Sequence, residues 1–157
     1  MNNSVMNPQD APSAKLAECF VTVGSRRYNV LSGKSFEANA NISTEEVNVI
    51  GRIMKGHKAN GLEGTFSMTV YKCSAMFGNM VEEYKKTGVL PVFDIQVTSE
   101  DPATSIGADT KIYTGCQLDG DVLLSMFDAE GDFIEQEVSG FFDDWQNASD
   151  YTEPAGM

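Results

Sequence analysis

The sequence of 157 residues predicts one mainly β domain, in which two packed antiparallel sheets form a sandwich or barrel with one flanking α-helix. Two observations predict this fold. Apolar and polar residues alternate over several short segments that turn-forming residues separate, and apolar residues follow a helical spacing in a single segment. We expect a flexible arm over residues 1–14, the domain over residues 15–145 and a polar tail over residues 146–157.

The first predicted element is a short hairpin. Residues 19–23 alternate with the period of a strand, and residues 27–31 return after a turn at Gly24-Ser25.

A longer hairpin is predicted over residues 36–71. Apolar residues alternate in its first half and continue after a polar break as far as residue 53, and they alternate again from residue 66. Residues 51–64 between them hold four glycines and a basic cluster, so we expect a strand end and a mobile loop at the tip.

A single helix is predicted over residues 74–88. Ser74 can serve as its N-cap and Gly88 as its C-terminal stop, and Glu82 and Lys86 form an i,i+4 pair in the favoured order. One face is apolar and should pack on the sheet. Its residues are Met76, Phe77, Met80, Val81 and Tyr84.

The second half of the chain predicts further strands over residues 93–98 and 112–118. The Asp119-Gly120 pair favours a tight hairpin turn, which predicts a returning strand over residues 122–127. A second turn leads to a last strand over residues 133–142. The whole chain then holds about nine strands.

Charge is distributed unevenly along the chain, whose formal net charge is −12. Residues 24–90 carry nine basic and six acidic side chains, whereas residues 94–157 carry one basic and fifteen acidic side chains. This balance argues against a dedicated nucleic-acid binder. It indicates either a solvated acidic surface or opposite patches that meet head to tail between copies.

The sequence offers no membrane or secretion signal. No apolar run approaches the roughly 18 residues of a membrane helix. Residues 1–14 hold no Lys or Arg and no apolar core. We therefore expect neither membrane anchoring nor a secretory signal.

The residues also offer no site for catalysis, a metal or a cofactor. The three cysteines are odd in number and far apart, which favours reduced thiols, and His57 is the single histidine. Residues 33–35 (Gly-Lys-Ser) lack the first glycine of a phosphate loop. Residues 119–130 match part of a calcium-hand spacing, but Leu124 stands where that loop needs glycine. We expect a protein that is not an enzyme and needs no cofactor.

Several motifs, in this order, resemble those of a known family. They are a Phe-Glu-Ala-Asn strand at residues 36–39, a Gly-Arg-Ile-Met-Lys-Gly-His-Lys loop at residues 51–58, and Tyr71-Lys72 before the helix. An aromatic, acidic segment over residues 138–145 closes the match, which begins at about residue 16. The chain resembles the tail tube proteins of contractile-tailed phages and of phage-tail-like particles of Gram-positive bacteria.

The resemblance implies a structural virion protein. It implies six protomers in a ring whose inner sheets join into a continuous barrel, with rings stacked helically into a conduit for genome delivery. The partners implied are the tail sheath, the baseplate and tail terminator proteins, and a tape measure protein in the lumen. DNA would pass without specific binding, and the tube would be assembled in the bacterial host cytoplasm.

Two sets of residues are candidates for this role. Contacts between subunits are expected along residues 41–58, where acidic and basic side chains stand at opposite ends: Glu45, Glu46, Arg52, Lys55, His57 and Lys58. An acidic lumen wall would repel phosphate and let a duplex slide. Its candidate residues are Asp94, Asp119, Asp121, Glu135 and Glu137.

Two other functions stay open at this point. The tube of a phage-tail-like bacteriocin would carry no DNA, and a solitary β-sandwich binding module would not assemble at all. Against the module stands the lack of an exposed aromatic cluster, because Trp145 is the single tryptophan.

Overall fold

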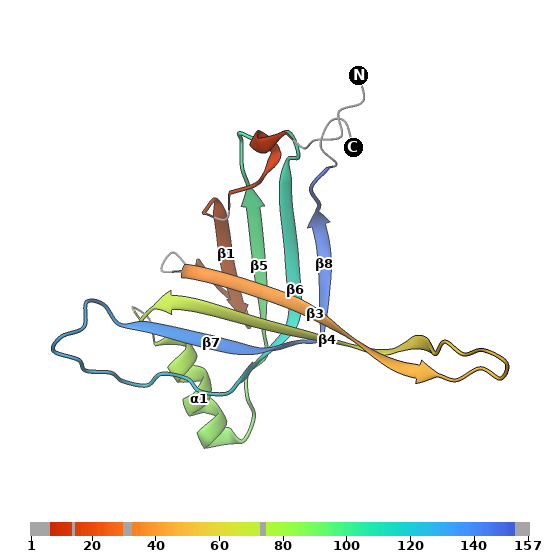
Figure 1. The fold of residues 1–157 in the computed structure, drawn as a ribbon. Coiled ribbons are helices and arrows are strands. Elements are labelled where there is room, and N and C mark those ends of the chain that lie inside the picture. Colours follow the sequence, from red (N-terminus) through yellow and green to blue (C-terminus); the bar gives the residue numbers. More distant parts are fainter. Residues whose placement is uncertain (1–6, 14, 30–32, 73–74, 153–157) are drawn as a thin grey trace.

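A computed structural model describes residues 7–13, 15–29, 33–72 and 75–152. In these residues eight strands form one antiparallel sheet, accompanied by one α-helix and one 3-10 turn (Figure 1). The expected mainly β fold with one helix is therefore confirmed. The elements are η1 (Pro8–Asp10), β1 (Ala17–Val23), β2 (Arg26–Asn29), β3 (Gly33–Val47), β4 (Gly56–Tyr71), α1 (Met76–Thr87), β5 (Phe93–Glu100), β6 (Ala108–Asp119), β7 (Glu135–Phe142) and β8 (Asp144–Ser149).

Strand β6 belongs to both halves of this sheet. It pairs with β8 as far as Thr114, with β5 as far as Cys116, and with β7 from Gln117 onward. Just before the change of partner, Thr114 and Gly115 face the single residue Asp94, and Gly115 has a φ of +68°. Such a bulge bends a strand. In Figure 1, β1, β5 and β8 accordingly run across the direction of β3, β4 and β7.

The sheet is folded rather than divided. Its strand order is β2-β1-β5-β6-β7-β4-β3, with β8 added to β6, so β2, β3 and β8 are edge strands and the sheet does not close. The expectation of two separate packed sheets, or of a closed barrel within one chain, is therefore not confirmed.

One apolar core lies between the two halves of the folded sheet. Phe66 of β4 meets Phe93 of β5 edge to face, with 5.9 Å between ring centroids. Val21, Ile95 and Val138 are fully buried beside them. Each side chain of this size contributes about 1.5–3 kcal/mol when buried, so the core is what keeps β6 bent and the halves together.

Helix α1 covers one side of this core with its first two turns. Phe77 and Met80 are buried, and the chain ends the helix at Gly88, whose φ is +77° and whose N–H donates to the Tyr84 carbonyl at 2.8 Å. The predicted pair of Glu82 and Lys86 is present at 3.0 Å. The predicted apolar face extends one residue too far, because Tyr84 is 53% exposed. The predicted N-cap, Ser74, lies outside the described residues.

Both predicted hairpins are present. β1 and β2 pair around the turn at residues 24–25, although residues 30–31 of the predicted return lie outside the described residues. β3 and β4 form the long hairpin. Its loop is shorter than expected, since β3 ends at Val47 and β4 already begins at Gly56.

The predicted strand over residues 122–127 was wrong. The chain leaves the sheet after Gly120 and returns as β7, which pairs with the end of β6 through Asp119↔Ser139. The partner of β6 is thus supplied by a later segment, and a long loop replaces the tight hairpin. Lys72 holds the base of this loop, because its backbone N–H donates to the Ile134 carbonyl and its Nζ to the Leu123 carbonyl.

Candidate assembly surfaces

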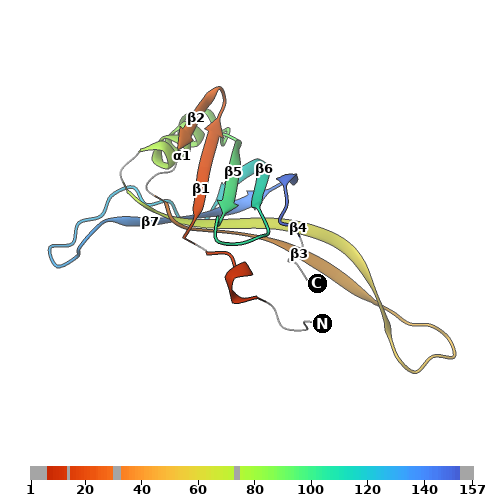
Figure 2. The same ribbon diagram turned by 90° about the horizontal axis from the view of Figure 1, so that it is seen from above.

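The β3–β4 hairpin extends well beyond the body of the molecule (Figures 1 and 2). β4 pairs with β7 only from Gly64 onward, so residues 56–63 have β3 as their single described neighbour. At about 3.3 Å per residue, these eight residues carry the tip roughly 26 Å away from the last pairing with β7. The end of the hairpin, residues 47–58, is called the hairpin tip below.

The hairpin tip carries apolar side chains that nothing in the described chain covers. Ile50 and Ile53 are fully exposed, and Met54 is 74% exposed. Isolated exposed apolar residues are ordinary, but a group of them on one protrusion marks a surface that other molecules contact.

The charged residues expected to make subunit contacts lie side by side on this hairpin. The register places Glu45 opposite Lys58 and Glu46 opposite His57, and Lys55 Nζ lies 3.3 Å from a Glu46 carboxylate oxygen. The acidic residues of β3 and the basic residues that follow the turn are thus partly paired within one copy. Arg52 and Lys58 have no ion pair within 4 Å in the described part of the chain.

A second surface is the outer face of β3, β4 and β7, which we call the polar face. Along β4 and β7 every second residue is buried in the core, so the residues between them point away from it. Apart from the aromatic residues Tyr71 and Phe141, these outward positions carry small polar and acidic side chains. They are Ser35, Glu37 and Asn39 of β3, Thr65, Ser67 and Thr69 of β4, and Glu135, Glu137 and Ser139 of β7.

Three of the five candidate lumen acids lie together on the polar face. Glu135 and Glu137 are two residues apart on β7, and Asp119 of β6 is the register partner of Ser139. Lys34 Nζ donates a 2.8 Å hydrogen bond to Glu135, which raises the pKa of Lys34. Sequence reasoning missed Glu37, although its alternation with Phe36 and Ala38 already placed it on the outward side.

The other two candidate acids are elsewhere. Asp94 lies on β5 opposite Thr22 of β1, in the other half of the folded sheet. Asp121 follows the end of β6 and lies in the long loop. The structure therefore does not bring Asp94 or Asp121 into the group formed by Asp119, Glu135 and Glu137.

That long loop, residues 120–134, is a third surface, which we call the acidic loop. It contains four carboxylates and no basic residue: Asp121, Asp128, Glu130 and Asp132. Phe127 is 94% exposed, and Phe133 is largely exposed while its ring contacts Tyr71 edge to face. The sequence assigned a strand here, so these exposed aromatic residues were not recognised as surface.

Both ends of the described chain are tied to one end of the molecule. The Asp10 carboxylate is buried and accepts hydrogen bonds from the Ser105 backbone N–H at 3.1 Å and hydroxyl at 2.8 Å. The Thr152 backbone N–H donates to the Ile106 carbonyl at 2.8 Å. The segments that flank the fold therefore meet at the loop between β5 and β6.

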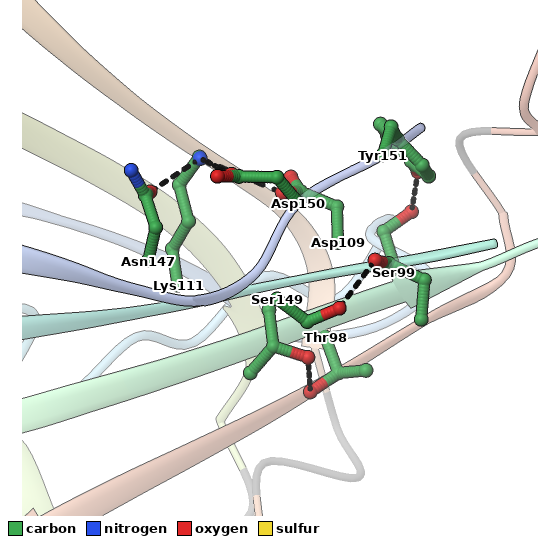
Figure 3. A network of polar contacts seen from close by, with 10 residues as sticks. Thr98, Ser99, Asp109, Lys111, Asn147, Ser149, Asp150 and Tyr151 are labelled. Atoms are coloured by element: carbon green, nitrogen blue, oxygen red, sulfur yellow. Dashed lines mark hydrogen bonds and ion pairs between the residues drawn. The ribbon is translucent and has the colours of Figure 1, made fainter. Parts of the chain in front are cut away.

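Lys111 fastens strand β8 near the same end (Figure 3). Its Nζ donates to Asn147 Oδ1 at 2.7 Å and to Asp150 Oδ1 at 3.2 Å, and Asp109 lies 3.5 Å away. Lys111 is the one basic residue after Leu90. It therefore neutralises the acidic segment where β8 joins the sheet edge.

The described residues hold little that resembles a reaction centre. They contain no group of three His, Cys, Asp or Glu side chains that could hold a metal ion. Burial raises the pKa of the Cys19 thiol to about 11 and that of Cys116 to about 12, which keeps both thiols protonated and unreactive near neutral pH. No helix within the described ranges is long and apolar enough to cross a membrane.

Known proteins are similar to this chain in sequence or in fold. The chain is 33% identical over 112 residues to the phage-like element PBSX protein XkdM of Bacillus subtilis (strain 168), covering 71% of this chain and 76% of that protein. It is 32% identical to YqbM of the same organism over the same shares of the two chains.

Two solved structures share the fold at low sequence identity. One is the tube-terminating cap of the anti-feeding prophage, with a TM-score of 0.63 and 13% identity, covering 94% of this chain and 97% of that chain. The other belongs to the extended sheath–tube complex of an extracellular contractile injection system, with a TM-score of 0.59 and 13% identity, covering 83% and 88%. A family model described as phage tail tube protein matches residues 4–148. The chain therefore belongs to the phage tail tube protein family, whose members are structural components of tails.

Proposed function

We propose that six copies of this chain form a ring, and that rings stack helically into the inner tail tube through which a genome is delivered. The observation that carries the proposal is the polar face on a sheet that stays open at β3. An open edge exposes unpaired backbone groups, and pairing with a neighbouring copy satisfies them.

Ring closure supplies the barrel that one chain lacks. When the free edge of β3 pairs with the β6–β7 side of the next copy, the strands β6, β7, β4 and β3 of all copies become one continuous wall. The apolar core then lies outside this wall, between it and strands β1, β5 and β8. In the assembled ring each protomer thus contributes an inner layer and an outer layer, which is the sandwich arrangement expected from the sequence.

The polar face forms the lumen in this arrangement. Asp119, Glu135 and Glu137 line it together with Glu37, and Ser and Thr side chains fill most of the positions between them, beside the exposed rings of Tyr71 and Phe141. Carboxylates repel phosphate over the roughly 8–10 Å that salt permits, and no basic patch holds the duplex by counterion release. DNA would therefore pass without specific binding.

The hairpin provides the subunit contacts. Its length places Glu45, Glu46 and the basic residues Arg52, Lys55, His57 and Lys58 beyond the body of their own copy. Each exposed ion pair contributes only about 0–1 kcal/mol, but a symmetric ring repeats every contact.

The remaining partners follow from the family and the fold. The structural neighbours come from a sheath–tube complex, a tube-terminating cap and a baseplate. We assign this chain the corresponding partners, namely a sheath, a terminator and a baseplate, and from the family resemblance alone a tape measure protein in the lumen. Assembly would take place in the host cytoplasm, and the finished tube would be part of the virion. The structural role requires no catalytic activity.

Electron microscopy and analytical ultracentrifugation of the purified chain, alone and with its baseplate, test the proposal. Rings with sixfold symmetry that stack into tubes are expected. A monomer at every concentration, with and without baseplate, would contradict it and favour a solitary binding module.

A second candidate is the tube of a particle that carries no genome. It is favoured by the relative XkdM, which is named for a phage-like element. Isolated particles should be treated with nuclease and then assayed for protected DNA of a defined length. Protected genomic DNA supports a phage tail tube, whereas particles without it support the second candidate.

A further inference from the structure

Two protrusions of this molecule expose apolar side chains at opposite ends. The hairpin tip presents Ile50, Ile53 and Met54, and the acidic loop presents Phe127 and Phe133. Figures 1 and 2 show the hairpin tip and the acidic loop on opposite sides of the folded sheet in both views. They cannot cover each other within one copy.

Their charges are complementary. The hairpin tip carries the basic residues Arg52, Lys55 and Lys58. Lys55 is paired with Glu46 of β3, and Lys58 stands opposite Glu45 without forming an ion pair, so Arg52 and Lys58 are the basic side chains left for another copy. The acidic loop carries four carboxylates, and its side chains form no ion pair in the described chain. Each protrusion therefore lacks counter-charges that the other one holds.

We infer that the hairpin tip of one copy docks on the acidic loop of a neighbouring copy. This inference rests on the proposed function and names the partner surface of the hairpin tip. Ile53 and Met54 pack against Phe127 and Phe133, while Arg52 and Lys58 face Glu130 and Asp132. Because the two surfaces differ, the contact is heterologous and can be repeated from copy to copy without end.

A rival acceptor for the exposed phenylalanines is the hollow at the base of the hairpin. It has a volume of about 270 Å³ and is lined by Leu62, Phe141, Phe142 and Trp145 together with Glu63 and Asp143. Its two carboxylates would face those of the acidic loop, and opposed like charges at an interface cost affinity. Charge thus favours the hairpin tip over this hollow as the partner of the acidic loop.

A mixing experiment tests the contact. One variant carries Arg52→Glu and Lys58→Glu, and a second carries Glu130→Lys and Asp132→Lys. Alone, each opposes like charges, which should raise the concentration needed for assembly roughly tenfold or more. Mixed in equal amounts, each variant meets the complementary surface of the other, so tubes should return toward the wild-type yield.

Control variants distinguish loss of the contact from loss of the fold and from a general effect of charge reversal. Lys85→Glu and Glu83→Lys reverse exposed charges on α1 and should assemble as the wild type does. Thermal unfolding should show that all variants retain the native fold. A photo-crosslinker in place of Ile53 gives a second readout that needs no charge reversal, and its cross-linked peptide should come from residues 120–134 of another copy.

The outcomes separate the two proposals. If the wild type never assembles, the proposed function fails and this contact fails with it. If the wild type forms tubes, the contact alone is overturned when either charge variant assembles normally by itself, when mixing restores nothing, or when Ile53 cross-links to the hollow around Trp145.

Discussion

Gly140 of β7 sits where β6 changes partners, and we expect its replacement by alanine to be severe. A Cβ atom built on Gly140 would lie 1.9 Å from the carbonyl oxygen of Gln117 and 3.0 Å from Cε1 of Phe66. Real Cβ atoms do not approach other heavy atoms closer than 3.0 Å, so the backbone of β6 must move by about an ångström or more. A glycine in a strand often marks such a close approach of another backbone.

The size of the expected loss of stability depends on which atom the new methyl group clashes with. Overpacking of a close-packed core costs typically about 1–3 kcal/mol. Here the obstacle is a backbone carbonyl rather than the end of a flexible side chain, so Gly140→Ala should lower the free energy of unfolding by about 3 kcal/mol. The same shift would loosen the pairing of β6 with β7 that holds Asp119 beside Ser139 on the polar face.

Urea unfolding followed by circular dichroism measures this change. Gly78→Ala in α1 is a matched control, because no heavy atom lies within 4 Å of its Cβ position and alanine favours a helix by up to about 1 kcal/mol. The identical substitution should therefore destabilise at one position and stabilise at the other. A Gly140→Ala variant within 0.5 kcal/mol of the wild type, a limit of roughly the size of ordinary surface substitutions, would refute the packing argument.

Three further predictions concern the core, the thiols and the edge of the sheet. Phe77→Ala removes a buried ring of the core and should cost about 3–5 kcal/mol in urea unfolding, and a cost below about 1 kcal/mol would contradict its burial. Cys19 and Cys116 should react with a thiol reagent at pH 8 only after unfolding, since burial raises the pKa of both thiols. The pKa of Cys116 is about 12 in the folded protein against an ordinary 9.0. The contribution of this thiol to stability should therefore be complete below pH 9 and lost as the pH rises toward 12. Rapid labelling of Cys116 in the native protein at pH 8 would refute this. Lys111→Met should cost about 0–1 kcal/mol, more at low salt, and should speed amide hydrogen exchange around Asn147; unchanged exchange there would mean that Lys111 does not fasten β8.

The periodic spacing of apolar residues correctly predicted the elements that have one buried side. Helix α1 and strands β1, β4, β5 and β7 have buried residues on one side, and residues such as Phe66 and Val138 mark that alternation in the sequence. The outer part of the β3–β4 hairpin is exposed, although its apolar residues, such as Ile42, alternate in the same way. Strand β8 was missed because its residues are mostly exposed, so no apolar alternation reports it. Its pairing with β6, from Thr110↔Ser149 to Thr114↔Asp144, is a tertiary contact that local sequence does not encode.

The error over residues 122–127 has a related cause. Val122, Leu124 and Met126 alternate like a strand, but two of them are exposed in the acidic loop rather than packed in the core. An alternating pattern predicts a strand when an edge is free to receive it, and here β7 takes the end of β6.

The candidate site was predictable to the extent that it depends on alternation. The sequence named Asp119, Glu135 and Glu137 as candidates without assigning their faces, and the register groups these three with Glu37 on the polar face. Asp94 could not be separated from this group by sequence, because its place depends on the bend of β6 at Gly115.

The acidic half of the chain is divided between surfaces that respond to salt in opposite ways. Strands in a sheet lie about 4.8 Å apart, so in the proposed ring the carboxylates of β3 and β6 that adjoin between copies, such as Glu37 and Asp119, come within a Debye length of each other, and their repulsion opposes closure. In the proposed contact the acids of the acidic loop, such as Glu130, face the basic hairpin tip of another copy, and their attraction favours association. Added salt weakens both effects. Moderate salt should therefore promote ring closure while it weakens contacts made by the hairpin tip, so rings and tubes should differ in the salt concentration at which they are most abundant. If the two respond to salt alike, a single set of charges governs both steps, and the division of the acids between the polar face and the acidic loop has no functional meaning.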